Sequence, residues 1–113
     1  MRWFLRSKIH RATVTEANPD YTGSITVDQA LVEKAGLLPG EKVLVVSLTS
    51  GARLETYIIV GKRDSGEICM NGAAALLIKR GEKIIIMGFE LLSEPIKSIN
   101  ILVDEQNKFI KFL

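Results

Sequence analysis

Apolar and polar residues alternate or cluster in short stretches along this chain, and few stretches keep the longer period of a helix. Two stretches favour short helices: 29–35, between an N-cap at Asp28 and a stop at Gly36, and an Ala-rich segment from Asn71-Gly72 to about Lys79. The pattern predicts strands over residues 3–15, 24–27, 42–48, 53–60, 67–70, 82–89, 99–103 and 108–112. We therefore expect a mainly β domain with short helices.

Two segments of the chain repeat each other. Residues 40–46 read Gly-Glu-Lys-Val-Leu-Val-Val, and residues 81–87 read Gly-Glu-Lys-Ile-Ile-Ile-Met; each follows a predicted helix. Gly-Glu-Lys before an apolar strand is a common pattern, so coincidence is the alternative, but the matching helices favour a true repeat. A unit that cannot bury its apolar face alone should pack against its copy. The repeat thus predicts a closed barrel with pseudo-twofold symmetry, which also removes exposed sheet edges.

The size and charge of the chain indicate a single domain and give no sign of nucleic-acid binding. The chain has 113 residues, of which 47% are hydrophobic, so we expect one domain, residues 1–113, that would gain stability from assembling into an oligomer. The formal net charge of +2 is too balanced to indicate nucleic-acid binding. Basic residues do crowd the first strand, which is either a solvated edge or an anion-binding surface: Arg2, Arg6, Lys8, His10 and Arg11.

The single cysteine, Cys69, excludes an internal disulfide and is expected to be a small buried apolar residue in a reducing cytosol. Charge comes too early for a signal peptide, and no apolar run reaches the length of a membrane span. We therefore expect a cytoplasmic protein with no membrane partner. With one histidine and one cysteine far apart in sequence, no metal-ligand set is recognisable.

The Gly23-Ser24 step opens a predicted strand. A serine hydroxyl can attack the preceding carbonyl, and glycine at that position tolerates the backbone geometry required. The resulting ester can eliminate to dehydroalanine, which hydrolyses to a pyruvoyl group. By itself the dipeptide is far more often an ordinary turn, so its surroundings decide.

Two strands carry residues that could serve such a site. On the first, Lys8 and His10 share a face, so a carboxylate-binding cation lies beside the only histidine. On strand 53–60, Arg53 and Tyr57 share a face, and these types bind carboxylates and donate protons. Thr56 faces the other way on a regular strand, so a role shared with Tyr57 would need a bulge or a second cavity. Each of these residues could equally be an ordinary surface or core residue.

The segment Asn71-Gly72-Ala73-Ala74-Ala75 is the last candidate. Its small residues let a ligand approach the backbone, and the free N–H groups of a helix N-terminus attract anions. The alternative is a tightly packed short helix capped by Asn71.

Together these segments resemble the pyruvoyl-dependent aspartate 1-decarboxylases, in the order and spacing of that family and over nearly the whole chain. The resemblance rests on the stretches 5–15, 21–24 (Tyr-Thr-Gly-Ser), 51–57 (Gly-Ala-Arg-Leu-Glu-Thr-Tyr) and 71–75. It implies a double-psi β-barrel, a homotetramer, a maturation factor as a candidate partner, and conversion of L-aspartate to β-alanine for pantothenate synthesis. Leu76, where many relatives carry His, and the turn Asn18-Pro19-Asp20 depart from the family pattern.

The resemblance also implies roles for individual residues. Self-cleavage between Gly23 and Ser24, assisted by Thr56, would give a β chain 1–23 and an α chain 24–113, with Ser24 as the pyruvoyl group that forms a Schiff base with the substrate. Tyr57 would be the proton donor. Substrate-binding and supporting roles would fall to Lys8, Arg53, Gly72, Ala73, Ala74, His10, Tyr21 and Asn71. We expect Lys8 and Arg53 to hold the retained β-carboxylate, because pairing the departing one with a cation would stabilise the ground state.

One alternative belongs to another class. A small barrel with a basic strand can act as an oligomeric module that binds DNA or a protein. Arg6, Lys8 and Arg11 would then contact phosphates, and Gly23-Ser24 would be a plain turn.

Overall fold

The computed structural model describes the whole chain, Met1–Leu113, as one mixed nine-stranded sheet with two short helices. The helices are α1 (Gln29–Ala35) and α2 (Ala74–Leu77). The strands are β1 (Arg2–Thr13), β2 (Glu16–Asn18), β3 (Ser24–Asp28), β4 (Lys42–Ser47), β5 (Arg53–Gly61), β6 (Ile68–Asn71), β7 (Lys83–Leu92), β8 (Ile99–Val103) and β9 (Phe109–Phe112). The mainly β prediction is confirmed.

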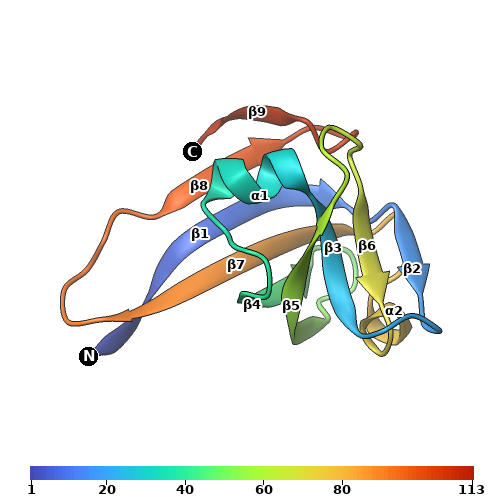
Figure 1. Cartoon of the computed structure of the whole chain (residues 1–113), viewed down its shortest axis with the longest axis horizontal. Coiled ribbons are helices and arrows are strands. Elements are labelled where there is room, and N and C mark those ends of the chain that lie inside the picture. Colours follow the sequence, from blue (N-terminus) through green and yellow to red (C-terminus); the bar gives the residue numbers. More distant parts are fainter.

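The strands follow the order β2-β6-β3-β5-β4-β7-β1-β8-β9. Two long strands, β1 and β7, run antiparallel along the length of the molecule, while β3, β5 and β6 gather at one end beside β2 and α2 (Figure 1). Strand β1 also pairs in parallel with β8, and β3 pairs in parallel with β5 and antiparallel with β6. Strand β3, which begins at Ser24, is therefore held by hydrogen bonds on both edges.

Helix α1 is fixed at both ends by the residues that the sequence predicts. The Asp28 carboxylate accepts a hydrogen bond from the backbone N–H of Ala30, and Gly36 ends the helix with a φ of 72°. The apolar side of α1 joins the core, and the Ser7 hydroxyl on β1 donates to the Ala35 carbonyl oxygen over 2.6 Å. The helix thus covers the sheet where β1 and β3 approach it.

The two copies of the repeat pair with each other. Strands β4 and β7 run antiparallel, and Val45 lies opposite Ile86, its counterpart in the repeat. Each copy begins with the same turn. The Glu41 carboxylate accepts from the N–H of Leu38, and the Glu82 carboxylate accepts from the N–H of Lys79. Equivalent residues of the two copies thus meet across a local twofold axis.

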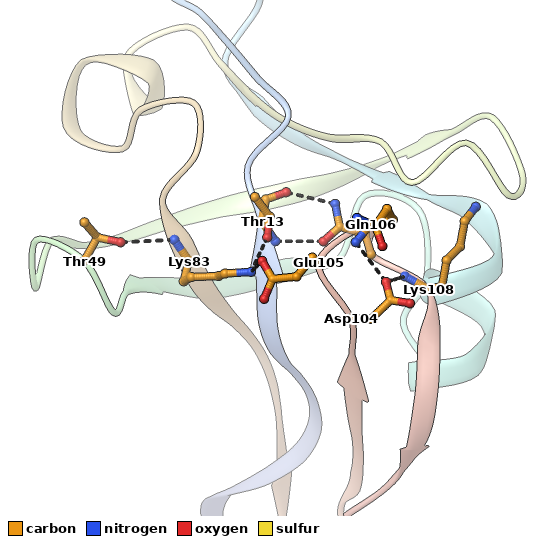
Figure 2. A network of polar contacts seen from close by, with 8 residues as sticks. Thr13, Thr49, Lys83, Asp104, Glu105, Gln106 and Lys108 are labelled. Atoms are coloured by element: carbon orange, nitrogen blue, oxygen red, sulfur yellow. Dashed lines mark hydrogen bonds and ion pairs between the residues drawn. The ribbon is translucent and has the colours of Figure 1, made fainter.

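The turn of the β8–β9 hairpin is bound to the end of β1 (Figure 2). Thr13 donates its backbone N–H to the Asn107 amide oxygen over 2.7 Å, and the Asn107 amide returns a bond to the Thr13 carbonyl over 2.9 Å. Lys83 donates to the Thr13 hydroxyl and pairs with Glu105. These contacts fix the C-terminal hairpin against the central pair of strands.

The structure corrects three boundaries. Strand β1 ends at Thr13, and a separate strand β2, which was not predicted, follows beside β6. The two residues between them change partners: Val14 bonds to the Glu82 carbonyl oxygen beside β7, and Thr15 bonds to that of Ile68 on β6. Strand β7 runs past Gly88 to Leu92. Helix α2 has only four residues and no side-chain cap, so it ends before Lys79, and the alternative in which Asn71 caps it does not hold. Asn71 is instead the last residue of β6.

None of the helices is long and apolar enough to cross a membrane. No group of three or more His, Cys, Asp and Glu side chains lies close enough together to hold a metal ion.

Candidate active site

Ser24 is completely buried at the first position of β3, between β5 and β6. On one side it lies opposite Asn71 of β6, whose amide nitrogen donates to the Ser24 hydroxyl oxygen over 2.9 Å. On the other side the parallel ladder between β3 and β5 begins one residue later, with Ile25 opposite Ile58. Tyr57 is therefore the next residue in register beside Ser24, just beyond the paired region.

A cavity of about 360 Å³ opens at this point. Its walls come from the end of the loop before β3, from the first half of β5, and from the β6–α2 segment: Gly23, Ser24, Leu54, Glu55, Thr56, Tyr57, Asn71, Ala73, Ala74 and Leu77. The structure thus brings together Gly23, Ser24, Thr56 and Tyr57, as the sequence indicated, although most of the chain between them forms other parts of the fold.

Thr56 and Tyr57 line the same cavity without a bulge, since the β4–β5 register is regular. Strand β5 pairs with β3 only from Ile58 onward, so residues 53–57 have a free edge on that side. Side chains from both faces of a strand can flank a space that lies along its free edge. The expectation that a shared role needs a bulge or a second cavity is therefore wrong.

Gly72 fills a position that only glycine fits. Its φ is +68°, and a Cβ atom built there would lie 2.7 Å from the Gly23 Cα and 2.9 Å from the Tyr21 carbonyl oxygen. Its N–H donates to the Asn18 carbonyl oxygen over 2.8 Å. Gly72 therefore leaves room for the backbone of Tyr21 and Gly23 to pass close by, and it is Ala73 and Ala74 that face the cavity.

The aspartate decarboxylase family model matches residues 1–110 of the chain. The chain belongs to this family. It is 55% identical over 111 residues to the aspartate 1-decarboxylase of Caldicellulosiruptor saccharolyticus, covering 95% of this chain and 87% of that protein. It is 56% identical over 93 residues to the Bacillus subtilis protein of the same name, covering 82% and 73%, and 53% identical over 111 residues to that of Neisseria meningitidis, covering 95% and 87%. The family predicted from the sequence is confirmed.

Besides Gly72, four of the predicted site residues lie outside the cavity of a single chain: Lys8, His10, Tyr21 and Arg53. Lys8 and His10 lie on β1, opposite Met87 and Ile85 of β7, away from β3. Arg53 is exposed at the start of β5. Tyr21 is also largely exposed and borders a separate hollow of about 370 Å³, whose wall includes Asn71 and Thr26.

His10 is a partly buried histidine whose Nδ1 atom has no hydrogen-bond partner. Burial lowers the pKa of His10 from its usual value, and the positive charges of Lys8 and Arg11 lower it further. At pH 7 the imidazole is therefore mainly in its neutral form.

The basic first strand is less available to phosphates than its sequence indicated. Arg6 donates to the Gly36 carbonyl oxygen over 2.6 Å and forms an ion pair with Glu41, so it ties β1 to the α1–β4 connection. Together with the family match, this contact favours the enzyme over a DNA-binding or protein-binding module.

Sequence reasoning assigned no role to three residues of the cavity wall: Leu54, Glu55 and Leu77. Glu55 carries the only formal charge in that wall, and Lys42 pairs with it over 2.8 Å. Leu54 and Glu55 lie inside the stretch 51–57 that carried the family resemblance, so their place in that motif was the available signal. No signal marked Leu77, because its position depends on where the short helix α2 ends.

Proposed function

We propose that this protein is an aspartate 1-decarboxylase that converts L-aspartate to β-alanine and CO2 for pantothenate synthesis, with a pyruvoyl group made from Ser24. The family match over residues 1–110 and the relatives of that name support the activity. The observation that carries the mechanism is the buried Ser24 hydroxyl at the wall of a cavity that also contains Thr56, Tyr57 and Asn71.

The hydrogen bonds of the Ser24 hydroxyl support an attack on its own backbone. It donates its hydrogen toward the Thr22 carbonyl oxygen over 3.3 Å and accepts a hydrogen from the Asn71 amide, which leaves one lone pair of the oxygen free. Attack on the Gly23 carbonyl carbon would form an ester and release the Ser24 amino group. Elimination then frees Gly23 as a carboxylate and leaves dehydroalanine, which water converts to the pyruvoyl group with loss of ammonia. The products would be chains 1–23 and 24–113.

The residues present fit a pyruvoyl group. It would begin β3, with the Asn71 amide as a hydrogen-bond donor on one side and the cavity on the other. Such a carbonyl group takes up the substrate amine and accepts the electrons released when CO2 departs.

Tyr57 is placed to return a proton to the substrate. It borders the cavity beside Ser24, and its side chain is 39% exposed, which supports a role in the site over that of a core aromatic. Leu54, Leu77 and Ala73 supply an apolar wall on which a departing carboxylate finds no cation. This wall favours loss of the α-carboxylate, because it gives the charged ground state no stabilisation.

The retained carboxylate needs a cation that the cavity of one chain does not contain. Lys8 and Arg53 are the family's candidates, and neither lines the cavity. In a homotetramer, a neighbouring copy can bring its β1 to this cavity, so that Lys8 of one chain would complete the site of the next. We therefore propose that the tetramer is the catalytic unit.

The same proposal includes a double-psi β-barrel. Residues 14 and 15 join β1 to β2. In the sheet order β1 is the third strand from one end, and β2 is the strand at the opposite end. Both joining residues are bonded: Val14 donates to the Glu82 carbonyl oxygen and Thr15 to that of Ile68. This connection between the two ends of the order, with the pairing of the two repeat copies, supports closure with internal pseudo-twofold symmetry.

Intact-mass measurement tests the proposed function. The wild-type protein should yield two fragments divided before Ser24, with an amine-free new N-terminus that borohydride traps in the presence of aspartate. Ser24→Ala should remain one chain without activity. Tyr57→Phe should still cleave but turn over poorly, since it lacks only the proton donor. An uncleaved Tyr57→Phe protein would contradict that assignment, and a cleaved Ser24→Ala protein would contradict the whole mechanism.

A further inference from the structure

Thr26 shares the Asn71 side chain with Ser24. The two residues are two apart on β3, so their side chains lie on one face of the strand. The Asn71 amide nitrogen donates one hydrogen to the Ser24 Oγ and the other to the Thr26 Oγ1, each over 2.9 Å. Nothing in the family resemblance gave Thr26 a role.

The hydrogen bond to Thr26 decides which way the Asn71 amide points. A primary amide has two hydrogens on its nitrogen and none on its oxygen. Because two hydroxyl oxygens accept these two hydrogens, the nitrogen end stays turned toward Ser24. Without the Thr26 acceptor, the amide could turn over and present its oxygen, which would take the hydrogen of the Ser24 hydroxyl.

The orientation of the amide matters for the first step of self-cleavage. In that step a bond forms between the Ser24 Oγ and the Gly23 carbonyl carbon, the Gly23–Ser24 C–N bond breaks, and the hydroxyl proton ends on the freed Ser24 amine. With the amide nitrogen toward Ser24, the hydroxyl hydrogen points to the Thr22 carbonyl, and a lone pair remains for the attack. A reversed amide would bind that hydrogen and hold the hydroxyl in another direction.

The Thr26 hydroxyl does little else in the fold. It forms no other hydrogen bond, and the backbone of Thr26 is held by its partners Ile59 on β5 and Cys69 on β6. The methyl group packs close to Gly61, where an added Cβ would lie 3.0 Å away. Packing therefore depends on the methyl group, which valine retains, and the amide depends on the hydroxyl, which serine retains.

We propose that Thr26 is a positioning residue for self-cleavage, which orients the Asn71 amide so that Ser24 can attack the Gly23 carbonyl. This inference rests on the proposed function, because it concerns the step that makes the pyruvoyl group.

The test compares Thr26→Val with Thr26→Ser. Each protein is purified before cleavage is complete, and the cleaved fraction is followed over time by intact mass. Loss of one orienting hydrogen bond should slow the cleavage of Thr26→Val by roughly tenfold, whereas Thr26→Ser should stay within about twofold of wild type. An unchanged rate in Thr26→Val, or an equal loss in Thr26→Ser, would overturn the inference.

Uncleavable proteins separate positioning from folding. The double variant Ser24→Ala/Thr26→Val should still unfold cooperatively, with a thermal midpoint only a few degrees below that of Ser24→Ala, because valine keeps the packing of the methyl group and only one further acceptor of the Asn71 amide is lost. A double variant that fails to fold would show that slow cleavage of Thr26→Val reflects a structural role, and would overturn the inference. A wild-type chain that never cleaves, even when a maturation partner is supplied, would overturn the proposed function itself, whereas a cleaving wild type with a normal Thr26→Val rate would overturn only the role of Thr26.

Discussion

At the scale of single residues, the site depends on contacts between backbones as much as on functional side chains. Gly72 lies against Gly23, and any side chain at position 72 would collide with the Gly23 backbone, next to the peptide bond at which we propose cleavage. The glycine is needed for two reasons: its positive φ, and its lack of a Cβ where two chain segments meet.

Gly72→Ala should therefore slow self-cleavage and lower the free energy of unfolding by roughly 2–4 kcal/mol, the cost of a left-handed alanine together with a displaced backbone. The control is Gly51→Ala, which has a φ of +79° and no heavy atom within 4 Å of the added Cβ. It should lose about 1 kcal/mol through its φ alone and cleave at the normal rate. Time courses by intact mass and urea unfolding measure both effects; equal cleavage in the two variants would remove the steric argument.

Cys69 is buried, as the sequence indicated, and it lies near two carboxylates, those of Glu16 and Glu67. Burial raises the pKa of the Cys69 thiol to about 12, and the nearby carboxylates add to the rise. The thiolate is the reactive form, so native protein at pH 8 should react with iodoacetamide far more slowly than protein unfolded in urea. Mass spectrometry counts the label; rapid modification of the folded protein would show that this thiol is accessible and ionised.

At the scale of elements, one carboxylate joins a helix to a distant turn. Asp28 accepts hydrogen bonds from the N–H groups of Ala30, Asp64 and Gly66 over 2.9, 2.9 and 2.8 Å. Its side chain is buried, so it both caps α1 and anchors the β5–β6 turn. The sequence marked only the first of these roles, because the second depends on tertiary structure.

Asp28→Ala should cost roughly 3–5 kcal/mol of unfolding free energy, more than an ordinary cap, because three backbone donors lose their acceptor in a buried place. Asp104→Ala is the matched control. Asp104 accepts from the N–H groups of Gln106 and Lys108 at the exposed turn of the β8–β9 hairpin (Figure 2), so its loss should cost about 1 kcal/mol. Urea unfolding in the uncleavable Ser24→Ala protein measures both; equal losses would show that Asp28 acts only as a cap.

Local sequence signals predicted most helices and strands, but they failed where a contact with a residue distant in sequence determines the structure. Asp28, Gly36 and the strand patterns act within a few residues, so α1 and the long strands were correct. Asparagine is a residue type that often caps helices, yet the Asn71 side chain instead bonds to the Ser24 hydroxyl on β3. Likewise, alternation placed Thr56 and Tyr57 on opposite faces, but only the sheet order showed that this part of β5 has a free edge.

At the scale of the whole molecule, the predicted site residues lie in two separate regions of the chain's fold. The cavity contains Ser24, Thr56, Tyr57 and Asn71, whereas Lys8 and His10 lie on β1. Family resemblance names both sets but does not say which belong to one chain, because that depends on how copies assemble. The oligomer therefore stays a prediction.

Mixing two inactive proteins tests whether Lys8 acts across chains. Lys8→Ala lacks the cation and Ser24→Ala lacks the pyruvoyl group, so each should have little activity alone. When they are co-expressed with different tags and purified as mixed oligomers, roughly a quarter of the sites should combine an intact Ser24 with an intact Lys8 from a neighbour. Aspartate decarboxylation should then return in part. If Lys8 serves its own chain, no site is intact and mixing restores nothing.

The place of β1 in the sheet has a consequence for the mature protein. The segment before Gly23 contains β1, which lies between β7 and β8 and forms the long ladder with β7. If the chain is cut before Ser24 as we propose, the small fragment could not leave without breaking the ladders that β1 forms with β7 and β8, so the two fragments would stay together in one folded protein. Unfolding would, however, release two molecules where there was one. Refolding would then depend on the concentration of the two fragments, because they would have to associate again. The fold, first reached by one continuous chain, would therefore persist in the cleaved protein mainly because unfolding is slow.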